Sequence, residues 1–167
     1  PVIISEINFI GGCGMKKIFL LLTLIFTTLT FAKEEDIQGK WITEKAKNGN
    51  QIIVEFYKTN DRYFGKINQL TIPTYEKGHK LEGKTKLDLA NPDKNLKTRP
   101  LVGINFVSDF TYNPEKNRFE NGFIYNPENG KTYYCSISFK DPNTLIVKGS
   151  LDKSGLIGSK QIWTKIK

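Results

Sequence analysis

Residues 121–139 read N-G-F-I-Y-N-P-E-N-G-K-T-Y-Y-C-S-I-S-F, two runs of alternating apolar and polar residues joined by a turn-forming segment. In the second run the apolar positions share one face: Tyr133, Cys135, Ile137 and Phe139. This period of two is what a half-buried strand requires. Between the runs, Pro127 and the Asn129-Gly130 pair favour a tight reversal of the chain. The stretch therefore predicts a β-hairpin with one face packed against a core.

The same pattern recurs along most of the chain. Eight segments have the alternation of strands, and they begin at Lys40, Gln51, Arg62, Val102, Arg118, Lys131, Thr144 and Ser159. No amphipathic helix of ordinary length is predicted between them, so we expect an antiparallel meander rather than parallel crossovers. We predict an all-β fold, an eight-stranded antiparallel up-and-down barrel. The interior of such a barrel is either filled by side chains or holds one small ligand.

Two features interrupt this regular pattern. Gly65 inside the third strand predicts a bulge or a close approach of another part of the chain. Residues 71–100 contain three prolines and no sustained period, which predicts one long loop between strands 3 and 4; a loop of this length is usually either functional or disordered. Within it, Asn91 and Pro92 suit the N-cap and first position of one helical turn. Residues 109–117 predict the reversal before the hairpin.

The amino-terminal region predicts export. Residues 15–32 combine two lysines, an uncharged apolar run from Ile18 to Phe31 and a small residue at Ala32, the three parts of a secretory signal peptide. The apolar run is shorter than the roughly 20 residues of a membrane-spanning helix. We interpret residues 1–14 as an upstream extension and residues 33–167 as a single barrel domain. The predicted localisation is exported, either periplasmic or secreted.

The charge of the chain argues against nucleic-acid binding. The 167 residues carry 25 basic and 17 acidic side chains, a net charge of +8, but the lysines are scattered and form no block of like charge. Such a surface is more typical of solvated faces than of a nucleic-acid interface. Weak attraction to anionic surfaces of the cell envelope is the partner interaction that this charge favours.

The sequence offers little chemistry for catalysis. Cys135 is the one cysteine after residue 32, so no internal disulfide is expected there, and its strand pattern predicts a buried small hydrophobe. His79 lies in the lysine-rich loop and is interpreted as solvated. Three residues have oxygen ligands at a spacing loosely suited to Ca²⁺: Asp88, Asn91 and Asp93. We interpret them as caps and turns and predict no metal, no cofactor and no enzyme, although paired carboxylates from distant strands remain an open alternative.

Several ordered motifs resemble known families. Gly39-Lys40-Trp41 resembles the G-x-W opening of lipocalins, in which the Trp closes one end of the barrel. Longer motifs resemble the bacterial exported family of domain of unknown function 2147: Asp88-x-x-Asn91-Pro92, Arg99-Pro100-Leu101-x-Gly103, Gly122-x-Ile124-Tyr125-x-Pro127-x-x-Gly130-Lys131-x-Tyr133, Val147-x-Gly149 and Gly158-x-x-Gln161-x-Trp163. The resemblance implies a lipocalin-like barrel outside the cytoplasm and no established activity. Phe119, where the family tends to have Trp, and Ser159-Lys160, where it often has Arg-Thr, depart from this pattern.

Aromatic residues recur on most predicted strands and suggest either a packed core or the lining of a pocket. The candidate ligand-binding residues are Phe56, Tyr63, Arg99, Phe106, Phe119, Tyr125, Tyr133 and Trp163, and the candidates for barrel closure are Gly39 and Trp41. The Arg99 guanidinium is expected either to stack on Trp41 or to face an anionic ligand group.

The predicted function is non-enzymatic binding of a small hydrophobic or amphipathic molecule inside the barrel, with residues 71–100 gating the mouth. The alternative is an envelope or secreted interaction protein with a filled barrel, which contacts a protein or glycan partner through its surface and the loop 71–100.

Overall fold

The computed structural model describes residues 32–166. Residues 1–14, and all of the predicted signal peptide except Ala32, lie outside this range. The described chain begins with a short 3-10 helix and continues as eight strands: η1 (Glu34–Ile37), β1 (Gly39–Ile42), β2 (Ile52–Thr59), β3 (Arg62–Leu70), β4 (Asn105–Asn113), β5 (Arg118–Asn126), β6 (Lys131–Asp141), β7 (Thr144–Ser150) and β8 (Gly158–Lys165). No helix in the described range is long and apolar enough to cross a membrane.

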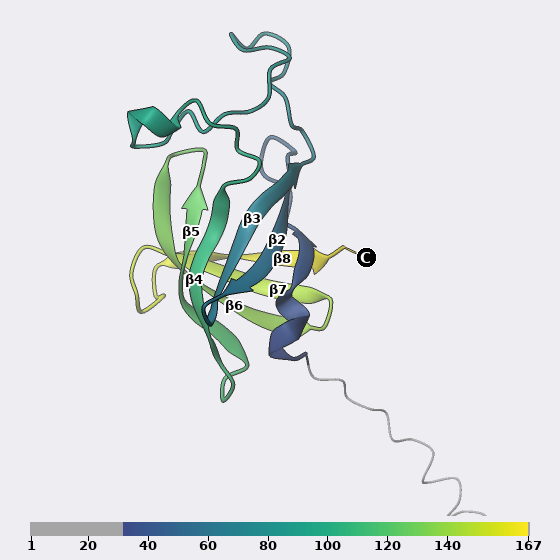
Figure 1. Ribbon diagram of the computed structural model, residues 1–167, viewed down its shortest axis with the longest axis vertical. Helices are drawn as coiled ribbons and strands as arrows, with labels where there is room; N and C mark the ends of the chain where they lie inside the picture. The colour runs from purple at the N-terminus through teal and green to yellow at the C-terminus, as the bar shows by residue number, and fades with distance from the viewer. Residues whose placement is uncertain (1–31, 167) are drawn as a thin grey trace, which may run out of the picture. The chain divides into compact units, whose positions relative to one another are not determined.

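The strands form a closed barrel in sequence order, and β1 pairs with β8 to complete the circle. Every neighbouring pair is antiparallel. The predicted all-β, eight-stranded up-and-down barrel is therefore confirmed. Its connections alternate between two ends, so residues 43–51, 71–104, 127–130 and 151–157 meet at the end that we call the mouth (Figure 1).

The hairpin predicted from residues 121–139 is β5 and β6. Tyr125 pairs with Thr132 and Asn126 with Lys131 across the turn. Gly130 adopts a φ of 70°, a conformation that suits glycine. A Cβ at this position would also lie 1.9 Å from the carbonyl oxygen of Ala90, so the turn packs directly against the long β3–β4 connection.

The predicted start and end of the fourth strand are wrong. Gly103 has a φ of 97° and its N–H donates to the carbonyl oxygen of Ile67, so the chain is still turning there, and Val102 is exposed rather than on a strand. β4 begins at Asn105 and continues through Asp109, which was predicted to start a reversal. Asp109 has a φ of 64°, a conformation common at turns, but here it is accommodated inside a strand.

The predicted bulge at Gly65 is confirmed. The pairing of β3 with β4 shifts register on both sides of this residue. A Cβ on Gly65 would lie 2.7 Å from side-chain carbons of both Val54 and Val107. Glycine therefore lets the walls of the barrel approach each other where the strand bends.

The end opposite the mouth is closed by η1. The Trp41 side chain is fully buried, and its indole N–H donates to the carbonyl oxygen of Ile37 at 2.7 Å. The Lys165 ammonium lies 5.3 Å from the centre of a Trp41 ring and donates to the carbonyl oxygen of Asp36. Gly39, with a φ of 106°, turns the chain from η1 into β1. Trp41 thus joins η1 to the first strand and fills this end of the barrel.

Candidate functional site

The mouth of the barrel opens into a cavity of about 760 Å³. Its lower walls are formed by residues of the strands, namely Ile52, Leu70, Phe106, Ile124, Tyr125, Tyr133, Val147 and Gly149. The connections at the mouth contribute the upper walls and rim, including Tyr75, Lys86, Leu89, Leu101, Pro127, Glu128, Leu151 and Ile157. A cavity of this size and apolar lining suits one small organic molecule.

Stacked aromatic rings form the floor of the cavity. Phe106 lines the cavity, and its ring stacks on Trp163 with 5.8 Å between ring centres. Phe56 also packs against Trp163, with 6.2 Å between the ring centres. Trp163 is fully buried, and its indole N–H donates to the side-chain oxygen of Gln161. The aromatic layer separates the cavity from the packed half of the barrel.

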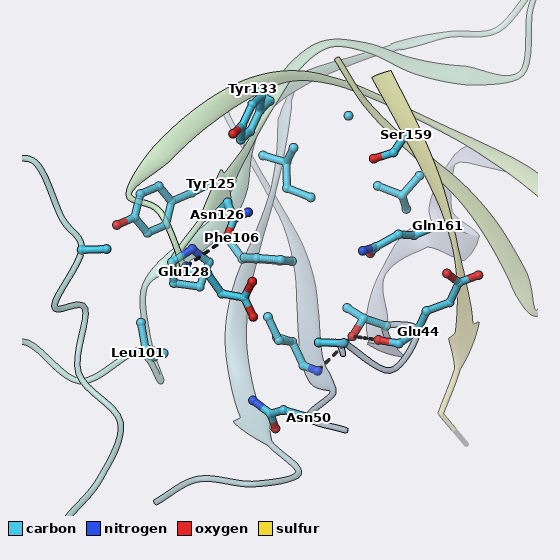
Figure 2. A pocket seen from close by; sticks show the side chains of 18 of the residues that line it. Glu44, Asn50, Leu101, Phe106, Tyr125, Asn126, Glu128, Tyr133, Ser159 and Gln161 are labelled. Carbon is cyan, nitrogen blue, oxygen red and sulfur yellow. Dashed lines mark hydrogen bonds between the residues drawn. The ribbon is translucent and has the colours of Figure 1, made fainter. Parts of the chain in front are cut away.

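Polar side chains gather near the opening rather than at the floor. Figure 2 shows Tyr125 and Tyr133 on one side of the cavity and Ser159, Gln161 and Glu44 on the other side, with the Tyr125 hydroxyl pointing away from the cavity. The Tyr133 hydroxyl accepts a hydrogen bond from the amide of Asn129 at 3.0 Å. Glu44 accepts from the backbone N–H of Ile162. The site therefore combines an apolar interior with a polar rim, which suits an amphipathic molecule.

The long connection, residues 71–104, is folded over one side of the mouth, and we call it the flap. It contains the short 3-10 helix η2 (Lys94–Leu96) and isolated bridges such as Leu87 with Pro100. The predicted helical turn is present but its N-cap differs, because Asp93 rather than Asn91 accepts the capping hydrogen bond from the N–H of Asn95. Asn91 instead accepts from the N–H of Asp93. The flap is thus ordered by its own hydrogen bonds.

A buried carboxylate ties the flap to the barrel. The Asp88 side chain is fully buried, and its Oδ2 accepts from Nε and Nη2 of Arg99 at 3.0 and 2.8 Å. The same oxygen accepts from the Asn91 amide at 2.7 Å, and Oδ1 accepts from the Tyr125 hydroxyl. Because Tyr125 belongs to β5 and also lines the cavity, this Asp88 cluster connects the flap directly to the cavity wall.

The Asp88 cluster changes the acidity of Tyr125. Burial and the hydrogen bond to Asp88 raise the pKa of the Tyr125 hydroxyl to about 12. At the closed end, burial and a hydrogen bond to Glu34 raise the pKa of Tyr63 to about 12 as well. The neutral phenols are therefore stabilised in the folded chain, a contribution that is complete below about pH 10, the usual tyrosine value.

Alkaline titration should show this difference. We expect Tyr63 and Tyr125 to ionise near pH 12 in the folded chain, which the ultraviolet absorbance of tyrosinate measures. Because the folded pKa is the higher one, the free energy of unfolding should decrease as the pH rises from about 10 to about 12. Titration of all seven tyrosines near pH 10 in the folded protein would contradict the burial of these two hydroxyls.

Comparison with known proteins places the chain in a family. Residues 39–165 match a family described as uncharacterized protein conserved in bacteria, DUF2147. The chain belongs to this family. Among solved structures it is similar to protein HP1028 from the human pathogen Helicobacter pylori, described as belonging to the lipocalin family, with 25% identity and a TM-score of 0.68 over 82% of this chain and 85% of that chain. Comparison with curated proteins finds no match.

The predicted resemblance to DUF2147 and the lipocalin-like character of the barrel are thereby confirmed. Residues of three separate motifs that carried the DUF2147 resemblance converge in space. Asp88 and Asn91 come from the first motif, Arg99 from the second and Tyr125 from the third, and all four belong to the Asp88 cluster. These residues of the family motifs therefore build the hydrogen-bonded contact between the flap and the cavity wall.

The eight predicted ligand-binding residues of this DUF2147 chain fall into three places. Three of them line the cavity: Phe106, Tyr125 and Tyr133. Four lie in the packed interior away from the cavity lining: Phe56 and Trp163 in the aromatic layer beneath Phe106, and Tyr63 and Phe119 near the closed end, where their rings meet edge to face. Arg99 lies outside the cavity and pairs with Asp88. It does not stack on Trp41, a position that Lys165 occupies instead.

Some lining residues were not singled out from the sequence. Lys86, Glu44 and Glu128 bring the charged groups of the rim, and each lies in a polar connection where alternation gives no signal, whereas the amide of Gln161 comes from β8, opposite Val147. Gly149 also lines the cavity, and the absence of a side chain there leaves part of the cavity empty. Its place in the alternation of β7, after Leu145 and Val147, predicts that Gly149 faces inward. The alternation does not predict that the space beside Gly149 is an empty cavity.

The residues that could support catalysis or metal binding have structural contacts instead. The His79 ring stacks on Tyr75 at 4.2 Å, and its Nδ1 accepts from the N–H of Leu81. Cys135 is a free thiol and is buried, as its strand pattern predicts. Burial raises the pKa of this thiol. Within residues 32–166 no group of three His, Cys, Asp or Glu side chains is arranged to hold a metal ion.

Proposed function

We propose that this DUF2147 protein is an exported, non-enzymatic lipocalin-like protein that binds a small hydrophobic or amphipathic molecule in the mouth of its barrel. The observation that carries the proposal is the 760 Å³ cavity with an aromatic floor, apolar walls and a polar rim. Such a cavity takes the apolar part of a ligand inside and leaves its polar group at the rim. The apolar run and small residue of segment 15–32 support export.

The flap gives the proposed site a means of access. Lys86, Leu87, Leu89, Ala90 and Leu101 of the flap line the cavity, so opening the flap would widen the mouth. The Asp88 cluster bonds the middle of the flap to β5 through side chains, while the two ends of the flap bond to Ile67 of β3 and to residues 50–51. We therefore propose that the Asp88 cluster separates from Tyr125 and the flap opens when a ligand enters or leaves.

Filling the cavity is the direct test of ligand binding. A Cβ on Gly149 would meet one atom within 4 Å, a methyl carbon of Ile124 at 3.4 Å, so a larger side chain can extend into the cavity. We expect Gly149→Leu to weaken binding of a fluorescent fatty-acid analogue by at least about tenfold, equivalent to about 1.4 kcal/mol. Because glycine is unfavourable inside a strand, stability should be unchanged or slightly higher.

The matched control places the same side chain outside the barrel. Ser136 on β6 is the neighbour of Cys135, the residue paired with Gly149, and faces outward, so Ser136→Leu should leave probe binding unchanged. Native mass spectrometry of protein purified from its own host should show a bound small molecule with the wild type and not with Gly149→Leu. Equal probe affinity in the wild type and Gly149→Leu would overturn cavity binding.

The alternative function is recognition of a protein or glycan partner through the flap. Exposed Leu89, Leu96 and Val102 on the flap favour it. Chemical cross-linking in the envelope should then identify a partner that is lost when the flap is shortened while the barrel remains folded. Under this alternative, Gly149→Leu would retain the partner.

A further inference from the structure

Exposed apolar side chains concentrate at the mouth. Among residues 32–166, eight large apolar side chains are exposed, and six of them lie in the connections at the mouth: Leu89, Leu96, Val102, Leu151, Leu156 and Ile157. Leu156 is 88% exposed and Leu151 and Ile157 about two thirds exposed. Single exposed apolar residues are ordinary, but a gathering at one end of the molecule marks a surface that contacts something apolar.

The most exposed of these residues sit on an ordered loop between β7 and β8, residues 151–157. The N–H of Leu151 donates to the carbonyl oxygen of Ile157, and the Asp152 carboxylate accepts from the N–H of Ile157 and from the Ser154 hydroxyl. These hydrogen bonds lower the pKa of Asp152, and its carboxylate is bonded to donors within the loop. Leu156 is therefore presented to solvent by a fixed backbone, and its insertion into an apolar phase requires little further ordering.

Basic charge accompanies the apolar residues. The connections at the mouth contain ten basic and seven acidic residues, whereas those at the closed end contain two basic and five acidic residues. The two ends of the barrel therefore differ in sign. The mouth is the end that an anionic surface would attract.

Lysines flank the β7–β8 loop in an arrangement that packing does not explain. Lys148 and Lys160 are directly opposite each other on β7 and β8 and face outward, and Lys153 lies in the loop between them. Like charges opposite each other in a sheet are destabilising. None of the three forms an ion pair within the described part of the chain. A surface rich in negative charge would relieve this repulsion.

We propose that the mouth docks on an anionic lipid bilayer, with Leu156 inserted among the lipids and the three lysines at the headgroups. Apolar side chains combined with neighbouring lysines are the features by which proteins bind at the bilayer interface. The inference rests on the proposed function, because docking brings the open cavity against the membrane. An amphipathic ligand would then pass between bilayer and barrel without crossing water.

The test uses the full barrel domain and vesicles of two compositions, phosphatidylcholine alone and phosphatidylcholine with phosphatidylglycerol in equal parts. We expect cosedimentation with the anionic vesicles that weakens as salt screens the lysines. Leu156→Asp should reduce this binding at least about tenfold, because it places a carboxylate in the apolar and anionic contact. Ile166→Asp, at an exposed apolar position near the closed end, is the matched control and should bind as the wild type does.

A fluorescent variant reports the contact itself. Trp41 and Trp163 are fully buried, so the emission of Leu156→Trp would add the signal of an exposed indole. We expect this emission to shift to shorter wavelength with anionic vesicles and to stay unchanged with phosphatidylcholine alone. Lys160→Gln should weaken the binding, whereas Lys140→Gln, an exposed lysine on β6 near the closed end, should not.

The outcomes separate this inference from the proposed ligand binding. Leu156 does not line the cavity, so Leu156→Asp should retain full affinity for the fatty-acid probe in solution, while Gly149→Leu should lose the probe and still bind vesicles. Equal binding to both vesicle compositions, or no effect of Leu156→Asp on vesicle binding, would overturn the docking proposal while leaving cavity binding intact. Capture of an acidic protein partner by Leu156 and the lysines, without vesicle binding, would also overturn it.

Discussion

Trp41→Ala should lower the free energy of unfolding by about 3–5 kcal/mol, the range for removal of a large aromatic side chain from a core. The Trp41 ring is fully buried at the closed end, packs against Phe139 and carries the one side-chain hydrogen bond from the strands to the carbonyl oxygen of Ile37 in η1. Truncation leaves a cavity and an unsatisfied carbonyl group at the same place. Urea unfolding followed by circular dichroism measures the change.

Two further variants separate the contributions of the Trp41 side chain. Trp41→Phe keeps most of the ring but removes the indole N–H, so we expect it to cost about 1 kcal/mol from the lost hydrogen bond and a further amount from the smaller ring. Tyr134→Ala removes an outward-facing, exposed aromatic residue of β6 and should change stability by no more than about 1 kcal/mol. A loss below about 1 kcal/mol for Trp41→Ala would show that the ring does not hold this end of the barrel.

The barrel could be predicted from sequence because the alternation of apolar and polar residues is a local property of each strand. β6 and the part of β3 from Arg62 to Ile67 follow it closely. β4 does not, because Gly103 and Asp109 adopt positive φ in the structure. Because the chain still turns at Gly103, the strand begins only at Asn105. Asp109 stays within β4 because the residues around it pair with β3 on one side and with β5 on the other, a tertiary constraint that the local sequence does not contain.

The cavity could be predicted only in part. The alternation of apolar and polar residues identifies which side chains face inward. It does not show whether an inward-facing side chain lies at the floor, in the walls or at the closed end. Tyr133 and Tyr63 are both inward-facing tyrosines, yet Tyr133 lines the cavity and Tyr63 lies at the opposite end, bonded to Glu34. The depth of a residue along the barrel depends on register and on where η1 and the aromatic layer fill the interior.

The role of Asp88 could not be predicted from spacing. Its partners Arg99 and Tyr125 are 11 and 37 residues away in the chain, and the bond to Tyr125 forms only when the flap folds onto β5. The resemblance to DUF2147 singled out Asp88, Asn91, Arg99 and Tyr125, but as members of separate motifs. Hydrogen-bond chemistry then explains why an acid, an amide, a guanidinium and a phenol occur together: one buried carboxylate needs several donors.

Asp88→Asn should release the flap. The carboxylate has two acceptor oxygens that together take four hydrogen bonds, whereas the asparagine amide has one acceptor oxygen and turns a donor toward either Tyr125 or the Arg99–Asn91 side. We expect the flap contacts to lose about 2–3 kcal/mol. The value is below that of a fully buried ion pair because the Arg99 side chain is 37% exposed and water can solvate it after the change.

Amide hydrogen exchange distinguishes loss of the flap from loss of the barrel. In Asp88→Asn the amides of residues 72–104 should exchange faster by a factor of about 30–150, the equivalent of 2–3 kcal/mol, while those of β2 and β6 change little. The alkaline titration should show a lower pKa for Tyr125, which loses its carboxylate partner, and an unchanged pKa for Tyr63. Asp93→Asn is the control, since Asp93 is exposed in the same flap and can still cap η2 as an asparagine.

The same experiment tests whether the flap controls the cavity. If the Asp88 cluster holds the flap closed, Asp88→Asn should increase both the association and the dissociation rate of the fatty-acid probe, because a less stable closed state opens more often. Its effect on affinity should be smaller than that of Gly149→Leu, which fills the cavity itself. Faster exchange of residues 72–104 with unchanged probe kinetics would mean that ligand passes through another part of the mouth, between the β1–β2 and β7–β8 connections.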